Sequence, residues 1–529
     1  MIREILSALQ IVLLSALILV TRCANYQNIF VAGNVYFVDA DCYARMTRVR
    51  MCHATPGLIV RHHAFENFPQ GTTPHTTAPF DYLILGLSVV LKPFTTRPLD
   101  LAGVFISPLL AIFGGWFLWW WSRKINLQYR WVMLILYAIS PILAHGAELG
   151  RPDHQSLSML LVTIAICSEW RSRAKAAETA ASTDHDKWNV VSGIAWGLAI
   201  WNSAYESLIL FLLVIVVRAL EDRKAMLAKS RRAGWLCFVF ILVVALLVER
   251  RIASLSILYP GAIFKQWAST IGELAHVSPK NPIWLRWCGY FLLITPFLIW
   301  MGTNRDRRRA EQAMPWFVPV LLVATYGLTI WQARWGYFFV LIFALALPAL
   351  LAPIKSRAAV WTAFVLSIYP ILRDWDQMLW PNETQLSRRM EQRYESAQIR
   401  DLALSLQSSE TRPFLAPWWL SPSIAYWSGQ PGVAGSSHES LRGIEDSARF
   451  FLSENLQTAR EILKKHKAAW VFAYDSERVA QNSAAVLNEP LPPLPLCHVL
   501  DRTPGQAPPF LIFSAQNATC KLYRVAIER

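Results

Sequence analysis

Two short polar segments contain the first groups in the sequence that could perform chemistry. One reads DADCYAR at residues 39–45, and the other reads ELGRPDHQ at residues 148–155. Carboxylate and amide oxygens are the ligands that hard divalent cations prefer. The two segments therefore predict a site for a divalent metal, and its candidate ligands are Asp41, Asp153, Gln155, Asp39 and His154. Taken singly, each segment also fits a solvated surface loop without a function.

Three further groups stand out by their type and setting. Glu273 ends the segment TIGE at residues 270–273, and Arg334 lies in a short polar segment between two tryptophans. An Arg guanidinium can bind phosphate oxygens, although an Arg beside interfacial tryptophans also fits simple snorkelling. A solvated loop acid is the alternative interpretation of Glu273. Trp418 and Trp419 are adjacent, and packing is the ordinary role of such rings.

The elements that must position these groups are membrane-spanning helices. The 529 residues are 54% hydrophobic and 12% aromatic with only 16% charged residues, unlike those of a soluble domain. Apolar runs of about 20 residues suffice to cross a bilayer, and they predict a polytopic α-helical membrane protein with about eleven spans. The first run also fits a cleaved signal peptide, but the many later runs favour a retained helix. The expected spans lie near residues 5–22, 101–121, 131–147, 155–170, 188–202, 206–219, 234–249, 284–302, 314–330, 335–352 and 358–373.

The basic residues predict the orientation of these spans, because cytoplasmic loops carry an excess of Lys and Arg. Such loops lie at residues 122–130, 171–187, 218–232, 303–312 and 353–357. They place the amino terminus in the cytoplasm and the acidic segments on the outer face of an inner or plasma membrane. The alternation holds only if residues 80–91 form a membrane-surface helix within a first outer loop of residues 24–100. The net charge of +15 has the same explanation, so no nucleic-acid partner is expected.

A change of composition after about residue 373 predicts a second domain. We expect a transmembrane domain at residues 1–373, with a flexible outer loop at 250–282, and a soluble extracytoplasmic domain at residues 374–529. A helical pattern at 448–468, followed by the apolar segment AWVFA at 469–473, predicts a mixed α/β fold for that domain. Two cysteine pairs could form disulfides on the outer side or stay free thiols, namely Cys42 with Cys52 and Cys497 with Cys520.

Taken in order, these motifs resemble the catalytic subunit of the oligosaccharyltransferase family, membrane glycosyltransferases of the GT-C type. DCYAR at residues 41–45 resembles the family's first acidic motif, and DHQ at residues 153–155 resembles its second. TIGE resembles the Thr-Ile-x-Glu motif of bacterial members, and Arg334 is similarly placed to the Arg that contacts the donor phosphates. Trp418-Trp419 resembles the start of the Trp-Trp-Asp motif, which the segment YWSGQP at residues 426–431 continues.

The resemblance implies a metal-dependent enzyme that moves a glycan from a polyprenyl-(pyro)phosphate donor to a protein. Its catalytic residues would be Asp41, Glu273 and Asp153. Mg²⁺ or Mn²⁺ would bind to Asp41 and Asp153, with Gln155, Asp39 and His154 as further ligands. Arg334 would bind the donor phosphate. Trp418 and Trp419 would contact the acceptor, which Glu273 would polarise from the flexible loop.

Three features depart from the family pattern. Gln155 stands where the family usually has a second metal-binding acid or His. Leu420 stands where the family's Asp accepts a hydrogen bond from the hydroxyl group of an Asn-x-Ser/Thr acceptor. The chain has about eleven spans against the family's thirteen, and the shortfall lies between Asp153 and Glu273.

These departures leave two other functions open. The first is a GT-C transferase with a hydroxyl, lipid or polysaccharide acceptor, which Leu420 favours. The second is a non-catalytic transporter or scaffold. It is less favoured, because transporters place functional charges at the midplane of broken helices, whereas the candidate groups here lie in outer loops.

Overall fold

The computed structural model describes residues 2–74, 78–172, 182–221, 223–226, 228–251, 261–304 and 314–526. The chain divides into two compact units. The helical unit comprises Met1–Gln27, Phe105–Ile252 and His276–Asn382, and the mixed unit comprises Asn28–Val104, Ala253–Ala275 and Glu383–Arg529. Parts of the basic loops expected at 171–187 and 303–312, and part of the outer loop expected at 250–282, lie outside the described residues.

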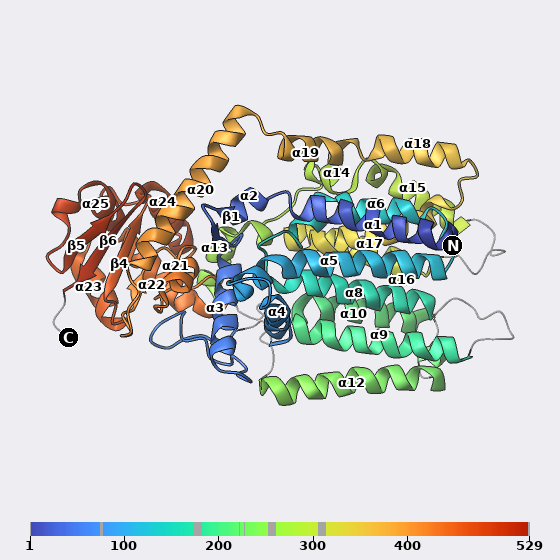
Figure 1. The fold of residues 1–529 in the computed structure, drawn as a ribbon, viewed down its shortest axis with the longest axis horizontal. Coiled ribbons are helices and arrows are strands. Elements are labelled where there is room, and N and C mark those ends of the chain that lie inside the picture. Colours follow the sequence, from blue (N-terminus) through green and yellow to red (C-terminus); the bar gives the residue numbers. More distant parts are fainter. Residues whose placement is uncertain are drawn as a thin grey trace. The chain divides into compact units, whose positions relative to one another are not determined.

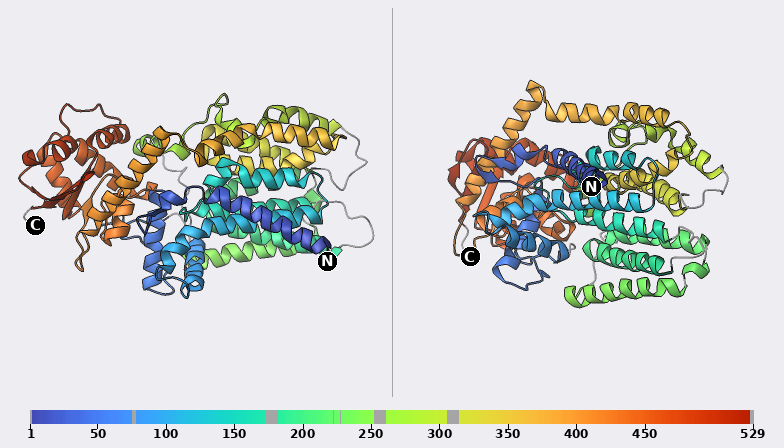
Figure 2. Two further views of the ribbon diagram at one scale, coloured as in Figure 1. Left: turned by 45° about the horizontal axis from the view of Figure 1, so that its top comes forward. Right: turned by 45° about the vertical axis from the view of Figure 1, so that its right-hand side comes forward.

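The helical unit consists of long helices that run side by side in the views of Figure 1 and Figure 2. A helix or a broken pair of helices lies at each position where the sequence predicts a span. The helices are α1 (Ile2–Arg22), α5 (Pro98–Lys124), α6 (Arg130–Ile139), α7 (Pro141–His145), α8 (His154–Arg171), α9 (Ser182–Asn202), α10 (Ala204–Glu221), α11 (Arg223–Met226), α12 (Lys229–Glu249), α14 (Ile283–Cys288), α15 (Phe291–Asn304), α16 (Phe317–Trp331), η4 (Ala333–Trp335), α17 (Gly336–Leu351), α18 (Arg357–Ser367) and α19 (Tyr369–Leu379).

Several expected spans are interrupted for identifiable reasons. Pro141 starts α7 and cannot continue the hydrogen bonding of α6. Gly289 separates α14 from α15 in a left-handed conformation with φ of 73°, which glycine adopts without strain. Pro370 lies in the first turn of α19, directly after α18. These breaks shorten the helices, so the number of spans stays a prediction.

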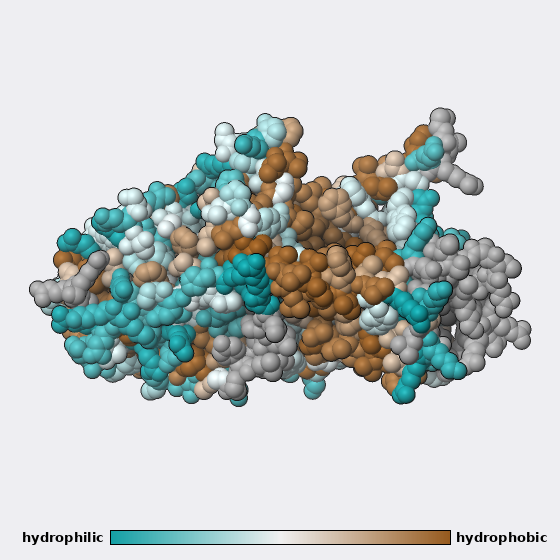
Figure 3. All heavy atoms as spheres, turned by 90° about the horizontal axis from the view of Figure 1, so that it is seen from below, coloured by the Kyte–Doolittle hydropathy of each residue, from teal (hydrophilic) through white to brown (hydrophobic). Residues whose placement is uncertain are grey.

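Four helices among the described residues are long and apolar enough to cross a membrane: Glu4–Arg22, Pro98–Lys124, Arg231–Glu249 and Ala333–Leu351. The last is the centre of the helical unit, with 89% of its apolar window buried, whereas the first and third are only 17% buried. Large apolar side chains on α12 are accordingly exposed, among them Leu236 and Phe240. Figure 3 shows apolar residues gathered in a band on one face. Such a surface is unfavourable in water and suited to lipid.

The mixed unit is built on a four-stranded sheet with the strand order β3-β4-β6-β5. The short strand β3 (Phe414–Leu415) pairs with β4 (Trp470–Tyr474) in parallel, and the other pairs are antiparallel. The remaining strands are β5 (Leu511–Gln516) and β6 (Cys520–Val525), and a separate hairpin contains β1 (Phe30–Val31) and β2 (Asn34–Val35).

Helices from three stretches of the chain complete this unit. They are α2 (Tyr26–Ile29), which begins at its edge, α3 (Ala40–Ala54), α4 (Ala78–Leu91), α13 (Ala262–Ser269), η2 (Gly272–Leu274), α20 (Glu383–Leu404), α21 (Ser421–Ser428), η5 (His438–Ser440), α22 (Leu441–Leu452), α23 (Leu456–Lys465), α24 (Ser476–Leu487), α25 (Leu496–Arg502) and η6 (Pro504–Gln506). All eight cysteines have free thiols, including both pairs that the sequence left open. The domain boundaries expected from the sequence stay a prediction.

Candidate functional site

The first acidic segment lies at the amino-terminal end of α3, in the mixed unit. Asp39 is the N-cap residue, and its carboxylate accepts a hydrogen bond of 3.0 Å from the Cys42 backbone N–H. Asp41 lies in the first turn, and its carboxylate accepts a hydrogen bond of 2.5 Å from the Ser436 hydroxyl. A helix amino terminus has a partial positive charge that stabilises carboxylates. Asp41 is therefore held by its own helix and by a residue that is 395 positions away in the chain.

The segment that follows the paired tryptophans packs on the same helix. Tyr426 and Trp427 of α21 make edge-to-face contacts with Tyr43 of α3, at ring-centroid distances of 5.6 and 5.0 Å. Arg50 lies over the Tyr426 ring at 3.3 Å, and the Tyr426 hydroxyl donates a 2.5 Å hydrogen bond to Asp100. Burial raises the pKa of Tyr426, so the phenol stays protonated and can donate this bond. This packing joins α21 firmly to the helix that carries Asp41.

The paired tryptophans themselves lie between α21 and the segment that contains Glu273. Trp418 donates a 2.7 Å hydrogen bond from Nε1 to Asn482, and its ring contacts Trp267 of α13 with the centroids 5.9 Å apart. The Trp419 Nε1 is buried without a hydrogen-bond partner in the described part of the chain. Glu273 lies on η2, shortly after α13, and is half-buried. The tryptophans and Glu273 thus belong to neighbouring parts of one packed unit.

The described part of the outer loop that contains Glu273 is folded against the mixed unit. Trp267 is 4% exposed and joins a core that includes Ile444 and Val486, with Phe264 and Ile271 packed against it. Residues before 261 in this loop lie outside the described range.

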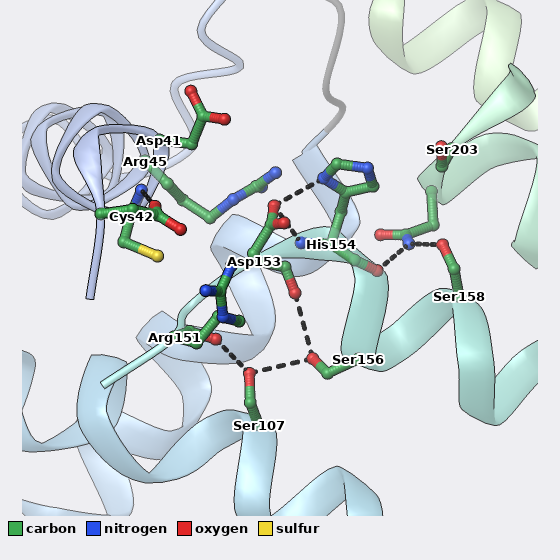
Figure 4. A network of polar contacts seen from close by, with 12 residues as sticks. Asp41, Cys42, Arg45, Ser107, Arg151, Asp153, His154, Ser156, Ser158 and Ser203 are labelled. Atoms are coloured by element: carbon green, nitrogen blue, oxygen red, sulfur yellow. Dashed lines mark hydrogen bonds and ion pairs between the residues drawn. The ribbon is translucent and has the colours of Figure 1, made fainter. Parts of the chain in front are cut away.

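The second acidic segment lies at the amino-terminal end of α8, in the helical unit (Figure 4). Asp153 is the N-cap residue, and its Oδ1 accepts hydrogen bonds from the His154 backbone N–H at 2.7 Å and from the His154 ring at 2.6 Å. The Ser107 hydroxyl donates to the Arg151 carbonyl and contacts the Ser156 hydroxyl at 3.0 Å. Gln155 is buried in the first turn of the same helix.

Arg334 lies on η4, between α16 and α17, and forms an ion pair with Glu206. Glu206 lies in the first turn of α10, and its side chain is 4% exposed. Its carboxylate also accepts a 2.8 Å hydrogen bond from the Ser203 hydroxyl. The Arg334 guanidinium lies 5.7 Å from the centroid of the Tyr205 ring. The ion pair with Glu206 therefore fixes the orientation of the Arg334 side chain. This side chain is still 20% exposed, so it is accessible to a ligand.

These two groups lie at the same end of the helical unit. Asn202, at the end of α9, donates a 2.9 Å hydrogen bond to the carbonyl of His154, and His154 also interacts electrostatically with Glu206. The sequence predicts Asp153 as a metal ligand and Arg334 as a phosphate-binding residue. These two residues are thus linked through His154 and Glu206.

The candidate residues are divided between the two units. The mixed unit contains Asp39, Asp41, Glu273, Trp418 and Trp419, and the helical unit contains Asp153, His154, Gln155 and Arg334. In the described part of the chain, no group of three or more His, Cys, Asp or Glu residues is arranged to hold a metal ion. The oxygen ligands suit a hard cation in type, so a divalent metal belongs to the proposed function.

Two residues that bind the charged group of a candidate, Glu206 and Ser436, are absent from the set that the sequence predicts. Glu206 binds Arg334, and Ser436 binds Asp41. Glu206 could have been found as an acid at the edge of an apolar segment, where an ionised group needs a partner. Ser436 has no comparable signal, because serines are common in loops and its partner lies far away in the chain.

The structure is similar to solved structures of GT-C glycosyltransferases. The archaeal oligosaccharyltransferase AglB from Archaeoglobus fulgidus, in complex with an inhibitory peptide and a dolichol-phosphate, matches with a TM-score of 0.67 and 14% identity over 90% of this chain and 70% of that chain. The same protein in complex with Zn and sulfate matches with a TM-score of 0.65 and 14% identity, over 97% and 73% of the two chains.

ArnT from Cupriavidus metallidurans, bound to undecaprenyl phosphate, matches with a TM-score of 0.57 and 14% identity over 97% of both chains. No protein-family model and no curated protein matches the sequence. At sequence identities of 14%, this similarity shows a shared fold and nothing more specific. The chain thus has the GT-C fold, and the resemblance indicated by its motifs is confirmed at the level of the fold.

Proposed function

We propose that the protein is a membrane glycosyltransferase that moves a glycan from a polyprenyl-(pyro)phosphate donor to a protein acceptor on the outer face of the membrane. The observation that carries the proposal is the attachment of Asp41 to the segment after the paired tryptophans, through Ser436 and through the packing of α21 on α3. The likeness to AglB, whose structures contain an inhibitory peptide and a dolichol-phosphate, supports it.

In this mechanism the donor phosphate is bound by Arg334. Glu206 holds the guanidinium in place. A bidentate Arg–phosphate contact orients the donor and stabilises the negative charge that develops on the leaving group. A divalent cation, Mg²⁺ or Mn²⁺, would add further stabilisation of that charge, and its candidate ligands are those that the motifs imply, Asp41, Asp153, Asp39, His154 and Gln155.

The acceptor is bound by the mixed unit in this proposal. Trp418 and Trp419 offer a half-buried aromatic surface beside α13. Glu273 accepts a hydrogen bond from the acceptor group and so increases its nucleophilicity. The amino terminus is cytoplasmic, and the carboxy-terminal part of the chain is on the outer side, as the basic loops predict.

A second acceptor class is supported by Leu420. Leu420 is the residue before α21, and it provides no side-chain hydrogen bond there. Without a carboxylate at this position, the hydroxyl group of an Asn-x-Ser/Thr acceptor would lose an interaction worth about 1–3 kcal/mol. A hydroxyl, lipid or polysaccharide acceptor would not need that interaction.

The test is a transfer assay with purified full-length protein, a polyprenyl-linked glycan and two acceptors, a sequon peptide and a lipid. We expect Asp41→Asn to lower transfer at least a hundredfold, since charge stabilisation is usually the largest catalytic contribution. Asp376→Asn, which alters an exposed acid of α19, is the matched control. Chelation should abolish transfer, and Mn²⁺ should restore it. Full activity of the Asp41 variant would refute the proposal, and transfer to lipid alone would select the second acceptor class.

A further inference from the structure

Three buried charges lie at the opposite end of α8 from Asp153. Glu169, near the carboxyl end of α8, forms ion pairs with Arg218 of α10 and with Arg231 of α12, the latter at 2.7 Å. The three side chains are between 1% and 9% exposed. At a rise of 1.5 Å per residue, Glu169 lies about 24 Å along the helix from Asp153. This buried triad is thus separate from the candidate functional site.

The triad carries a net positive charge. Glu169 Oε1 accepts hydrogen bonds from the Ser192 hydroxyl at 2.6 Å and from Arg231 Nη2 at 2.7 Å, and Oε2 accepts one from Arg218 Nη1. One carboxylate therefore faces two guanidinium groups. A buried charge without a counter-ion is strongly unfavourable, above all inside a membrane.

A small cavity adjoins the triad between α8, α9, α10 and α12. Arg231 and Trp196 both line it, and each has one buried nitrogen without a hydrogen-bond partner among the described residues, Nη1 and Nε1 respectively. The cavity has room for about one water-sized atom or molecule. Two free donors and an excess positive charge therefore surround a space that suits a single acceptor atom with negative charge.

We propose that this cavity binds a phosphate oxygen of an anionic phospholipid. Arg231 lies in the first turn of α12, and Glu169 lies in the last turn of α8. The site is thus at the level of the helix ends, where lipid head groups surround a spanning bundle. The exposed Lys229, two residues before Arg231 in the sequence, attracts the same head group. Arg231 Nη1 and Trp196 Nε1 donate to the phosphate oxygen, which neutralises the triad.

The experiment uses the full chain, purified in detergent and stripped of lipid. Its melting temperature is followed by tryptophan fluorescence while phosphatidylglycerol, phosphatidylcholine or inorganic phosphate is added. A ligand that binds only the folded state raises the melting temperature, and the rise grows with the logarithm of the ligand concentration divided by its Kd. We expect phosphatidylglycerol to raise it and the other two additions to leave it unchanged.

Two variants and one control assign the effect to this cavity. Arg231→Gln should weaken phosphatidylglycerol binding about tenfold or more, because a charge-assisted hydrogen bond is lost. Trp196→Phe removes the indole N–H and leaves a smaller aromatic ring that can still pack against Phe211. This variant should also weaken phosphatidylglycerol binding. It provides the test if Arg231→Gln fails to fold. Arg232→Gln removes the same charge from an exposed position and should bind nearly as the native protein does.

Each other outcome overturns the proposal. If inorganic phosphate gives the full rise, the site binds a free anion and not a lipid. If the native protein and the Trp196 and Arg231 variants respond equally to phosphatidylglycerol, the lipid binds elsewhere. If no addition changes the melting temperature of the native protein, the cavity does not bind phosphate.

Discussion

At the scale of single residues, the candidate acids have one feature in common. Asp39 and Asp153 are N-cap residues of α3 and α8, and Asp41 lies in the first turn of α3. Backbone N–H groups at a helix amino terminus stabilise the ionised carboxylate. The ionised carboxylate is the form that binds a divalent cation.

Ser436→Ala tests whether glycan transfer requires the Ser436 hydroxyl to orient the Asp41 carboxylate. The variant loses the 2.5 Å hydrogen bond to the Asp41 carboxylate. A hydrogen bond to a charged group contributes about 1.5–3 kcal/mol, so we expect glycan transfer to fall about tenfold or more. Ser437→Ala, at the half-buried neighbouring position, is the control and should be nearly as active as the native protein. Equal activity of both variants would show that Ser436 does not position Asp41.

Glu66 of the mixed unit should make stability depend on pH. Burial raises the pKa of its carboxyl from 4.5 to about 7, and Glu439 adds to the rise while Arg48 opposes it. Below pH 7 the folded protein keeps a proton that the unfolded chain releases near 4.5. The stabilisation by this group is therefore complete below pH 4.5 and is lost as the pH rises through 7.

The measurement is the melting temperature between pH 5 and pH 8. In the native protein, Glu66 should make it fall across this range by the equivalent of a few kcal/mol, on the order expected for a shift of this size. Glu66→Gln is always neutral, so its melting temperature should vary less over the same range. Parallel curves for the two proteins would contradict this assignment of the pKa.

At the scale of elements, α12 is attached to the helical unit mainly through α9. The backbones meet at Gly193 and Gly234, where a Cβ on Gly193 would lie only 2.0 Å from the Gly234 carbonyl oxygen. Side chains also hold α12 near both of its ends, since Arg231 binds Glu169 of α8 and Trp201 of α9 donates a 3.1 Å hydrogen bond to Glu249. Close backbone contact at small residues is a usual way for helices to associate in a membrane.

Gly193→Ala should separate α9 from α12. Because the added methyl group meets backbone atoms, which cannot rotate away, we expect a loss of about 1–3 kcal/mol in the free energy of unfolding. Gly327→Ala in α16 is the matched control, since a Cβ there meets nothing within 4 Å. It should be as stable as the native protein or slightly more stable. Thermal unfolding of both variants provides the comparison, and a Gly193 variant with native stability would disprove the close contact.

At the scale of the whole molecule, apolar surface and basic loops must agree on one membrane orientation. The exposed apolar faces of α1 and α12 require lipid around the helical unit. The loops at residues 122–130 and 353–357 carry the basic residues that predict a cytoplasmic location. The candidate acids then lie on the other side, where a lipid-linked donor could reach them.

Reporter fusions test this orientation. Alkaline phosphatase, which is active only outside the cytoplasm, should be active when fused after residue 526 and inactive when inserted in the loop at residues 122–130. Green fluorescent protein at the same two positions should give the reverse pattern. Phosphatase activity at the second position would show that the orientation is inverted, and the acceptor would then have to be cytoplasmic.

The sequence by itself predicts the helices of this protein and its fold class. Apolar runs determine where helices form, because each run must satisfy its backbone hydrogen bonds within itself in lipid. The caps at Asp39 and Asp153 are also local, since a capping side chain binds N–H groups within three residues. The order of these motifs was enough to indicate the GT-C fold, which the structural similarity confirms.

Only the tertiary structure determines which distant side chains meet. Asp41 with Ser436, Arg334 with Glu206, and Glu169 with Arg218 and Arg231 are pairs between separate elements. Their contact depends on how helices pack, and the period of apolar residues does not specify a partner. Glu169 illustrates the difference. In the sequence it is one acid at the end of an apolar run, and in the folded protein it is the centre of a buried charged site.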